Sequence, residues 1–361
     1  MNKMFLNLCL IFSMSLSASY ADGTAIDDEA ELAQDSAEPT EVNMTLIYGN
    51  TASTKENRAF DTFYKGWQAQ NNKDYKKAML YYKEASKEGC SAAQFHIAQM
   101  YEDGLGVNKD YQKALAEYEE IAKDGYAKAQ FLLAQMYESG KGIAKDSEKA
   151  FNWYKKAADQ GKLQAQLTLA KMYQDGIGIS KNLVKSAKYY KEAIRQGSLE
   201  AQTLLAKMYL NEKQMHKHYS KGKELIVKAA QKGEIKAQYY LSQAYLGSKV
   251  FKRDYKEAVY WLKKSADQGY AKAQYEIGSL YANAKYVELD YKKALYYLER
   301  SASSGYSSAQ YDLGLMYHEG LGVKIDKQKA YDYWSEASLN GDKDAEHNLE
   351  VLCKTSPSVC K

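Results

Sequence analysis

An alanine–glutamine pair recurs every 36 residues along most of this chain. The pair first stands at Ala93-Gln94 and returns at the same interval until Ala309-Gln310, and Ala345-Glu346 is a final, altered copy. A glycine stands four residues before each of these alanines, and a tyrosine stands eight residues after all but the last. A fixed period of this length is typical of proteins built from stacked supersecondary units, so it constrains the fold more than any other feature.

One period predicts two helices joined by a turn. Ala93, Ile97 and Tyr101 are spaced as residues on one face of an α-helix. The segment 103–107, Asp-Gly-Leu-Gly-Val, then favours a helix end, because glycine adopts the left-handed conformation without a steric penalty. Asp110 is placed to cap a second helix.

A single pair of helices would not be stable alone. Ordering one period costs roughly 50 kcal/mol at ~1.5 kcal/mol per residue, and two helices bury only one mutual face. Stacking each pair on the next supplies the missing apolar contact. We therefore predict an all-α fold, a right-handed α-solenoid of helix–turn–helix repeats with a period of 36 residues.

The repeated motif resembles the Sel-one-like repeat (SLR) family, a relative of the tetratricopeptide repeats. Residues 128–150 match nearly throughout its pattern Ala-Gln-x-x-Leu-Ala-x-Met-Tyr-x-x-Gly-x-Gly-[Val/Ile]-x-Lys-Asp-x-x-Lys-Ala, and the resemblance covers about 58–354. It implies an adaptor for other proteins, because most members of the family have that role and many are exported by bacteria.

Three turns depart from the family pattern. The Gly-x-Gly turn is missing at 211–218, 247–253 and 283–289, and Gly222 lies in the helix that follows the first of these. Glycine costs ~1 kcal/mol relative to alanine inside a helix. The segment 211–223 is therefore interpreted as a local hinge or as a looser loop.

The first 21 residues have the composition of a secretory signal peptide. Lys3 is their only charge, an apolar run follows from Met4 to Leu16, and small residues stand at Ser19 and Ala21. The apolar run is shorter than the ~20 residues of a membrane span. We expect cleavage after Ala21, export to the periplasm or the medium, and no stable membrane insertion.

The remaining boundaries follow from charge and periodicity. Eight acidic residues and no basic one stand between Asp22 and Lys55, so we expect an acidic disordered linker at 22–56. We place the SLR solenoid at 57–354, as about eight hairpins and a capping helix, and a tail at 355–361. The first hairpin is expected to begin with a helix at 57–70.

The cysteines predict one disulfide. Cys90, Cys353 and Cys360 remain after the expected cleavage. In an oxidising compartment Cys353 and Cys360 would pair, with Pro357 turning the chain between them, and would staple the final helix. Cys90 would be left over, either partly buried or free.

The sequence favours no catalytic site, metal or cofactor. His216 and His218 lie two residues apart, without a third ligand at a suitable spacing. Ser220 and Lys223 match Ser-x-x-Lys, but its companion motifs are absent from the sequence. The balance of 50 basic and 46 acidic residues argues against a nucleic-acid partner. We predict that the protein is not an enzyme.

The side of the first helices opposite Ala93 varies between repeats and is the expected protein-binding surface, because in SLR proteins the first helices line the concave side. The site consists of an aromatic row and a polar row beside it: Phe95, Phe131, Tyr239, Tyr275 and Tyr311, with Gln99, Gln135, Lys171 and Lys207. The alternative is that these side chains fill space between neighbouring repeats.

A basic edge is a second candidate surface, for an acidic partner or a membrane, or simply a solvated rim. It consists of Lys213, Lys217, Lys221, Lys223, Lys249, Lys252 and Arg253.

We therefore expect an exported SLR scaffold, an adaptor or regulator that binds a protein of unknown identity on its concave surface. One alternative is a solenoid that binds peptidoglycan or another cell-wall glycan, because sugars stack on tyrosine. A penicillin-binding or β-lactamase-like activity is the other, because cysteine-rich SLR proteins have been linked to penicillin binding. This chain lacks the cysteine pair that those proteins carry in each repeat.

Overall fold

The computed structural model describes residues 54–247 and 250–360. In these ranges the chain forms 17 α-helices and one 3-10 helix, and no strand. The expected signal peptide and most of the expected acidic linker lie outside the described residues. No helix in the described ranges is long and apolar enough to span a membrane.

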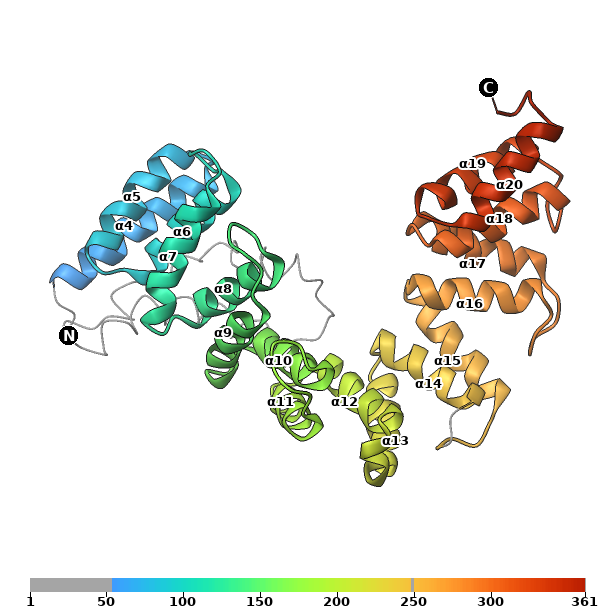
Figure 1. Cartoon of the computed structure of the whole chain (residues 1–361), viewed down its shortest axis with the longest axis horizontal. Helices are drawn as coiled ribbons and strands as arrows, with labels where there is room; N and C mark the ends of the chain where they lie inside the picture. The colour runs from blue at the N-terminus through green and yellow to red at the C-terminus, as the bar shows by residue number, and fades with distance from the viewer. Residues whose placement is uncertain (1–53, 248–249, 361) are drawn as a thin grey trace. The chain divides into compact units, whose positions relative to one another are not determined.

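The helices alternate between a first and a second helix of each repeat (Figure 1). The first helices are α4 (Thr54–Asn71), α6 (Ser91–Asp103), α8 (Ala127–Ser139), α10 (Leu163–Asp175), α12 (Leu199–Asn211), α14 (Ile235–Gly247), α16 (Ala271–Ala282), α18 (Ser307–Glu319) and the final α20 (Lys343–Thr355). The second helices are α5 (Tyr75–Lys87), α7 (Tyr111–Lys123), α9 (Ser147–Asp159), α11 (Leu183–Arg195), α13 (Tyr219–Gln231), α15 (Tyr255–Asp267), α17 (Tyr291–Ser303) and α19 (Lys327–Leu339). The first helix therefore begins three residues earlier than predicted.

The described residues form two compact units, divided between Tyr189 and Tyr190. Apart from α11, which contains the division, the two helices of a repeat pack against each other and each second helix packs against the next first helix. The predicted all-α solenoid of 36-residue repeats is confirmed.

Glycine and aspartate fix the ends of the helices. Gly104 ends α6 in the left-handed conformation, with φ of 75°. Asp110 caps α7 by accepting hydrogen bonds from the backbone N–H groups of Gln112 and Lys113. Gly106 also has a positive φ, and a Cβ placed there would lie 2.7 Å from Tyr75 atoms of the preceding second helix. This turn therefore sets how closely successive repeats approach.

The repeated glutamine ties one repeat to the next. The side chain of Gln130 is buried; its Nε2 donates to Ala122 O at 3.0 Å, and its Oε1 accepts from Gln160 Nε2 at 2.7 Å. Gln238 and Gln268 form the same pair at 2.7 Å. The alanine–glutamine signature thus combines a close helix contact with a satisfied buried amide.

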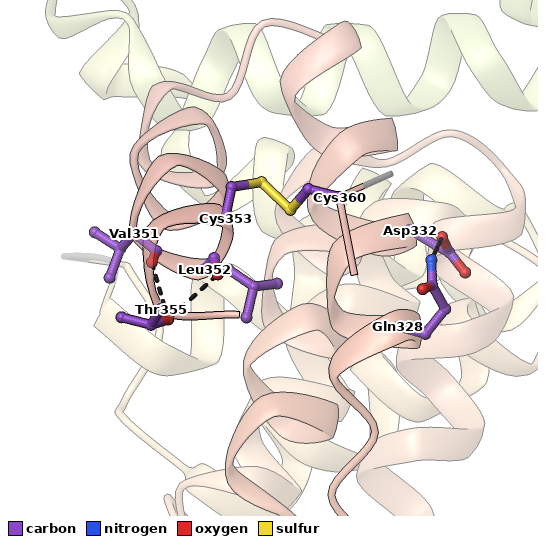
Figure 2. Close-up of a disulfide and its surroundings, with 7 residues drawn as sticks. All are labelled: Gln328, Asp332, Val351, Leu352, Cys353, Thr355 and Cys360. Atoms are coloured by element: carbon purple, nitrogen blue, oxygen red, sulfur yellow. Dashed lines mark hydrogen bonds between the residues drawn. A yellow bond between two sulfur atoms is a disulfide. The ribbon is translucent and has the colours of Figure 1, made fainter. Parts of the chain in front are cut away.

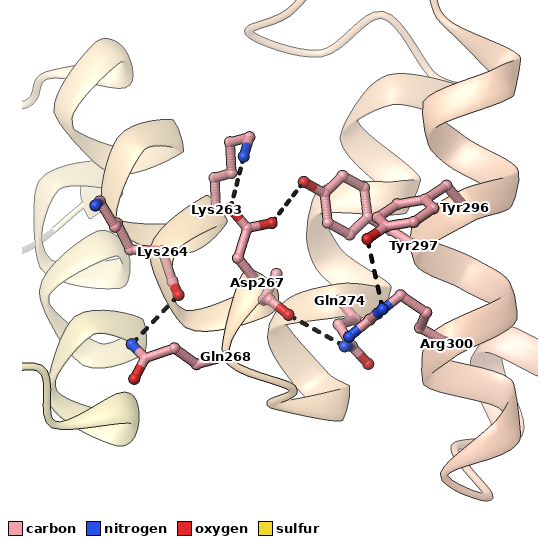
Figure 3. A network of polar contacts seen from close by, with 9 residues as sticks. Lys263, Lys264, Asp267, Gln268, Gln274, Tyr296, Tyr297 and Arg300 are labelled. Carbon is pink, nitrogen blue, oxygen red and sulfur yellow. Dashed lines mark hydrogen bonds and ion pairs between the residues drawn. The ribbon is translucent and has the colours of Figure 1, made fainter.

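A lysine–aspartate–tyrosine network joins successive second helices (Figure 3). Asp267, at the end of α15, accepts hydrogen bonds from Lys263 Nζ at 2.6 Å and from Tyr297 Oη of α17 at 2.9 Å. Asp159 accepts from Lys155 and from Tyr189 in the same way, at 2.6 and 3.1 Å. Charge-assisted hydrogen bonds of this kind are stronger than neutral ones.

The altered turns take different forms. Between α12 and α13 the chain forms the 3-10 helix η2 (Lys213–His218), so the predicted loop is partly helical. A Cβ at Gly222 would lie 3.0–3.2 Å from atoms of α12, so this glycine permits close packing of α13 on α12. The hinge at 211–223 stays a prediction.

A disulfide between Cys353 and Cys360 closes the C-terminal segment (Figure 2). Their Cα atoms are 5.6 Å apart. Val359 packs against the last apolar cluster, and Lys327 donates a hydrogen bond to Ser356. The segment after α20 therefore covers part of the core of the last repeat. Cys90 is a buried thiol at the start of α6.

Candidate protein-binding surface

Two members of the expected aromatic row belong to the core. Phe95 and Tyr239 are only 6% and 5% exposed. The Phe95 ring lies 5.7 Å from Tyr118 of α7 and 5.4 Å from Tyr126, which precedes α8. The side chain thus fills a niche between its own second helix and the next repeat. The expectation that these two residues offer a contact surface is corrected.

The other three aromatic residues are half-buried in the same niche. Phe131 packs on Tyr154 with ring centroids 5.5 Å apart, and Tyr275 packs on Tyr306 at 5.1 Å. Tyr311 is half-buried against the apolar cluster of the last repeat. The row is therefore a packing element with partly accessible edges, as the space-filling alternative describes.

The expected polar row lies nearer the solvent. Gln135 and Lys171 are exposed, whereas Gln99 and Lys207 are half-buried. Lys207 Nζ lies 3.2 Å from Tyr240 Oη and 4.6 Å from the centre of the Tyr240 ring. Its long side chain therefore crosses from α12 to α14.

A third row, missed in the sequence, completes this surface. We call it the inner row; its members each follow the aromatic position by one residue and are all half-buried: His96, Leu132, Thr168, Leu204, Tyr240, Glu276 and Asp312. Gln243 of α14 stands at the repeat position of Gln99 and so extends the polar row; its Nε2 donates to Glu276 of α16 at 2.6 Å. The polar row of one repeat thus meets the inner row of the next. Its signal in the sequence was its variability beside the constant alanine.

A pocket of about 260 Å³ opens on this surface within the second unit. It lies among α12, α13 and α14 and is lined by Lys207, Leu210, Asn211, Ile226, Tyr240, Gln243, Ala244 and Gly247. Its polar groups are an amine, two amides and a phenol around an apolar floor. Such a lining suits a side chain of another molecule that has both an apolar part and a polar group.

Burial shifts the pKa of groups in the inner row and in the aromatic row beside it. Burial, and then the nearby Asp342 carboxylate, raises the pKa of Asp312 to about 6. Burial, with a smaller effect of Asp312, raises the pKa of Tyr275 to about 12. Burial and the hydrogen bond to Glu276 also raise the pKa of Tyr239. The tyrosines here stay neutral hydrogen-bonding groups at physiological pH.

In the first unit the acidic residues near this surface bind to the protein itself. Glu102 accepts a hydrogen bond from Tyr118 at 2.9 Å and pairs with Lys141 of the next repeat at 2.7 Å. Glu138 likewise accepts from Tyr154. These carboxylates therefore make contacts between helices and repeats of the first unit.

The residues considered above as metal ligands or as a Ser-x-x-Lys pair can now be placed in the described structure. In the ranges 54–247 and 250–360, no group of three or more His, Cys, Asp and Glu side chains is placed to hold a metal ion. Ser220 is exposed on α13, and Lys223 Nζ lies 4.8 Å from the ring centre of Phe251.

Comparison with known proteins agrees with the repeat architecture. The Sel1 repeat model matches the eight consecutive segments 68–90, 91–126, 127–162, 163–198, 199–234, 235–270, 271–306 and 307–342. No curated protein sequence matches significantly.

Solved structures include two similar proteins. One is a protective antigen present in uropathogenic Escherichia coli strains that displays an SLR fold, with 25% identity, a TM-score of 0.61 and coverage of 88% of this chain and 68% of that one. The other is a Sel1 repeat protein from Oxalobacter formigenes, with 30% identity, a TM-score of 0.58 and coverage of 67% of this chain and 96% of that one. Since the repeat matches extend over far more than half of the sequence, this chain belongs to the Sel1 repeat family.

Proposed function

We propose that this protein is a non-catalytic scaffold that binds another protein through the polar and inner rows of its first helices. The observation that carries the proposal is the contact of the two rows across successive repeats, at Lys207–Tyr240 and Gln243–Glu276. These side chains differ between repeats while the core positions stay constant. A surface with a constant frame and variable polar side chains suits recognition of one specific partner.

The pocket beside these contacts supports the same proposal. It joins the amine of Lys207 and the phenol of Tyr240 to the apolar side chains of Leu210 and Ile226. Interfaces are stabilised chiefly by a few side chains that fill such pockets, with polar groups around them. An inserted side chain would displace the Lys207–Tyr240 contact.

Site-specific photocrosslinking tests the proposal. A photoreactive amino acid replaces Gln243 in the full-length chain, and a matched chain carries it at Tyr260, which is half exposed on α15. We expect a crosslinked protein from position 243 only, and its loss when Tyr240→Ala and Glu276→Ala are added. Equal crosslinking from both positions, or a product that survives both substitutions, would place the binding surface elsewhere.

We also propose that the protein is exported. The N-terminal sequence supports this, and so does the Cys353–Cys360 disulfide, because such bonds persist mainly in oxidising compartments. Mass spectrometry of the protein from its native host tests the idea. An N-terminus at Asp22 is expected, together with oxidised Cys353 and Cys360. An intact Met1 with reduced thiols would contradict export.

A further inference from the structure

The inner-row carboxylate of α16 has a hydrogen bond on each oxygen. Glu276 accepts through Oε1 from Tyr239 Oη and through Oε2 from Gln243 Nε2, each at 2.6 Å. Both donors stand on α14, the first helix of the preceding repeat. The Tyr239 ring also contacts Tyr270, which precedes α16, with ring centroids 5.3 Å apart. A carboxylate in the inner row thus receives its donors from the aromatic and polar rows of the repeat before it.

The next repeat keeps part of this arrangement. Asp312 of α18 stands at the position of Glu276, one period later. The tyrosine is kept as Tyr275, but Ser279 stands in place of the glutamine. The Tyr275 ring contacts Tyr306, which precedes α18, at 5.1 Å. Because the two tyrosine contacts match, α18 lies on α16 as α16 lies on α14, and the Tyr275 side chain is directed toward Asp312.

Asp312 lacks the two donors that the glutamate has. Aspartate is one methylene shorter than glutamate, so its carboxylate does not reach the tyrosine hydroxyl. Ser279 is shorter than glutamine, and its Oγ accepts a hydrogen bond from Asn283 Nδ2 at 3.2 Å. Among the described residues, no hydrogen bond or ion pair is made to the Asp312 carboxylate. The side chain is half-buried, so it can be reached from outside.

We propose that Asp312 receives an arginine side chain of the partner protein. The guanidinium would donate to the carboxylate the hydrogen bonds that Glu276 obtains from within the protein, and paired N–H donors of arginine match a carboxylate well. The inference rests on the proposed function, because it names the side chain that the same first-helix surface binds.

The surroundings of Asp312 favour arginine over a metal ion. The half-buried rings of Tyr275 and Tyr306 lie beside it, and Leu315 stands one turn further along α18. A guanidinium stacks on aromatic rings and is weakly hydrated, whereas a hard metal ion needs several oxygen ligands. No described group of three metal-ligating side chains is present. Asp342 caps α20 through its Oδ1, and its negative charge adds to the attraction for a cation.

The test measures the pKa of Asp312 in the full-length chain by NMR of carbon-13-labelled aspartate. The probe is Nα-acetyl-arginine amide, Nα-acetyl-citrulline amide is its neutral isostere, and Asp312→Asn assigns the signal. We expect the arginine probe to lower the pKa from about 6 to about 5 or below, because a bound cation favours the charged carboxylate. Citrulline should have no effect. The signal of exposed Asp332 is the internal control and should not move with the probe.

A second variant restores the missing donor. Ser279→Gln brings an amide toward Asp312, so we expect the arginine probe to bind about threefold more weakly or worse. Ser303→Gln, at an exposed position of α17, is the control and should bind the probe as the parent does. Circular dichroism confirms that both variants fold.

Four results would overturn the inference: no response of Asp312 to the arginine probe, an equal response to citrulline, a parallel response of Asp332, or unchanged binding in Ser279→Gln. A larger fall in pKa with Nα-acetyl-lysine amide would overturn the choice of arginine. The probe requires no partner, so this test is separate from crosslinking at position 243. A crosslink without a probe response would contradict the arginine site alone, and a probe response without a crosslink would contradict the proposed function alone.

Discussion

Tyr286 stacks on Tyr255 with ring centroids 4.1 Å apart and planes 13° apart. In the regular turns this place holds a glycine, such as Gly142 against Tyr111. Here the backbone keeps the regular path without glycine: Ala284 and Tyr286 have φ of 53° and 63°. The side chain of Tyr286 turns outward and covers the ring of Tyr255.

Ala284→Gly should stabilise the second unit. The left-handed conformation costs an alanine about 1–2 kcal/mol, and glycine adopts it without that penalty. We expect a gain of about 1 kcal/mol in the free energy of unfolding, measured by urea denaturation. The control Ala282→Gly lies in α16 and should lose about 0.5–1 kcal/mol. A gain in the control as well would disprove this explanation.

Ser304→Gln should also stabilise the protein. Gln274 Oε1 is buried without a hydrogen-bond partner, although Gln274 Nε2 donates to Ala266 O at 3.1 Å (Figure 3). In other repeats the donor to this oxygen is the residue that Ser304 replaces, such as Gln268 or Asn340. Supplying the donor should add about 1 kcal/mol to the free energy of unfolding. The neighbouring Ser303→Gln is the control, and an equal gain from it would contradict the assignment.

Cys353→Ser should loosen the C-terminal end alone. A disulfide that closes a loop this short stabilises the folded state by about 2 kcal/mol. Because α20 packs mainly on α19, we expect faster amide hydrogen exchange in α20 and α19 and unchanged exchange in α4 to α9. Dithiothreitol should reproduce the effect in the parent protein. Unchanged exchange in α20 would show that packing alone holds this helix.

Asp312 should make stability depend on pH. Its pKa in the folded state is raised to about 6, so the folded protein keeps this proton where the unfolded chain releases it near pH 4. Stability should therefore fall as the pH rises from about 4 to about 6. Asp312→Asn should gain on the order of 1 kcal/mol at pH 7.5 and nothing at pH 4, measured by urea denaturation. Exposed Asp332→Asn is the control. A gain that is equal at both pH values would rule out this role of Asp312.

The fold could be predicted because the same signals for helix ends and helix faces recur in nearly every repeat. The interval between Ala93 and Ala129, the glycines after α6 and the cap at Asp110 each indicate one helix boundary. The 3-10 helix η2 was not predicted, because Lys213 to His218 carry no strong helix or turn signal of their own.

The binding surface was only partly predictable. The sequence places Phe95 away from Ala93 on the helix, and this suggested an exposed residue. The period does not say which residues of the next repeat lie opposite, and Tyr126 closes the niche around Phe95. The contact between Gln243 and Glu276 depends on the same registration of one repeat on the next, so this contact could be found only in the three-dimensional structure.

The hydrogen bond from Tyr297 to Asp267 should make the junction between α15 and α17 stiffer than a junction that lacks such a bond. A solenoid bends by small rotations at each junction, in the manner of a spring. Between α15 and α17 such a rotation must stretch a charge-assisted hydrogen bond of 2.9 Å. At the following junction Ser303 stands in place of the aspartate and donates its hydroxyl to Arg300 O. Bending of the second unit should therefore be easier beyond α17, in the repeats that carry Asp312 and the disulfide, and also before α15, where Gln231 and Trp261 stand in the places of the aspartate and the tyrosine.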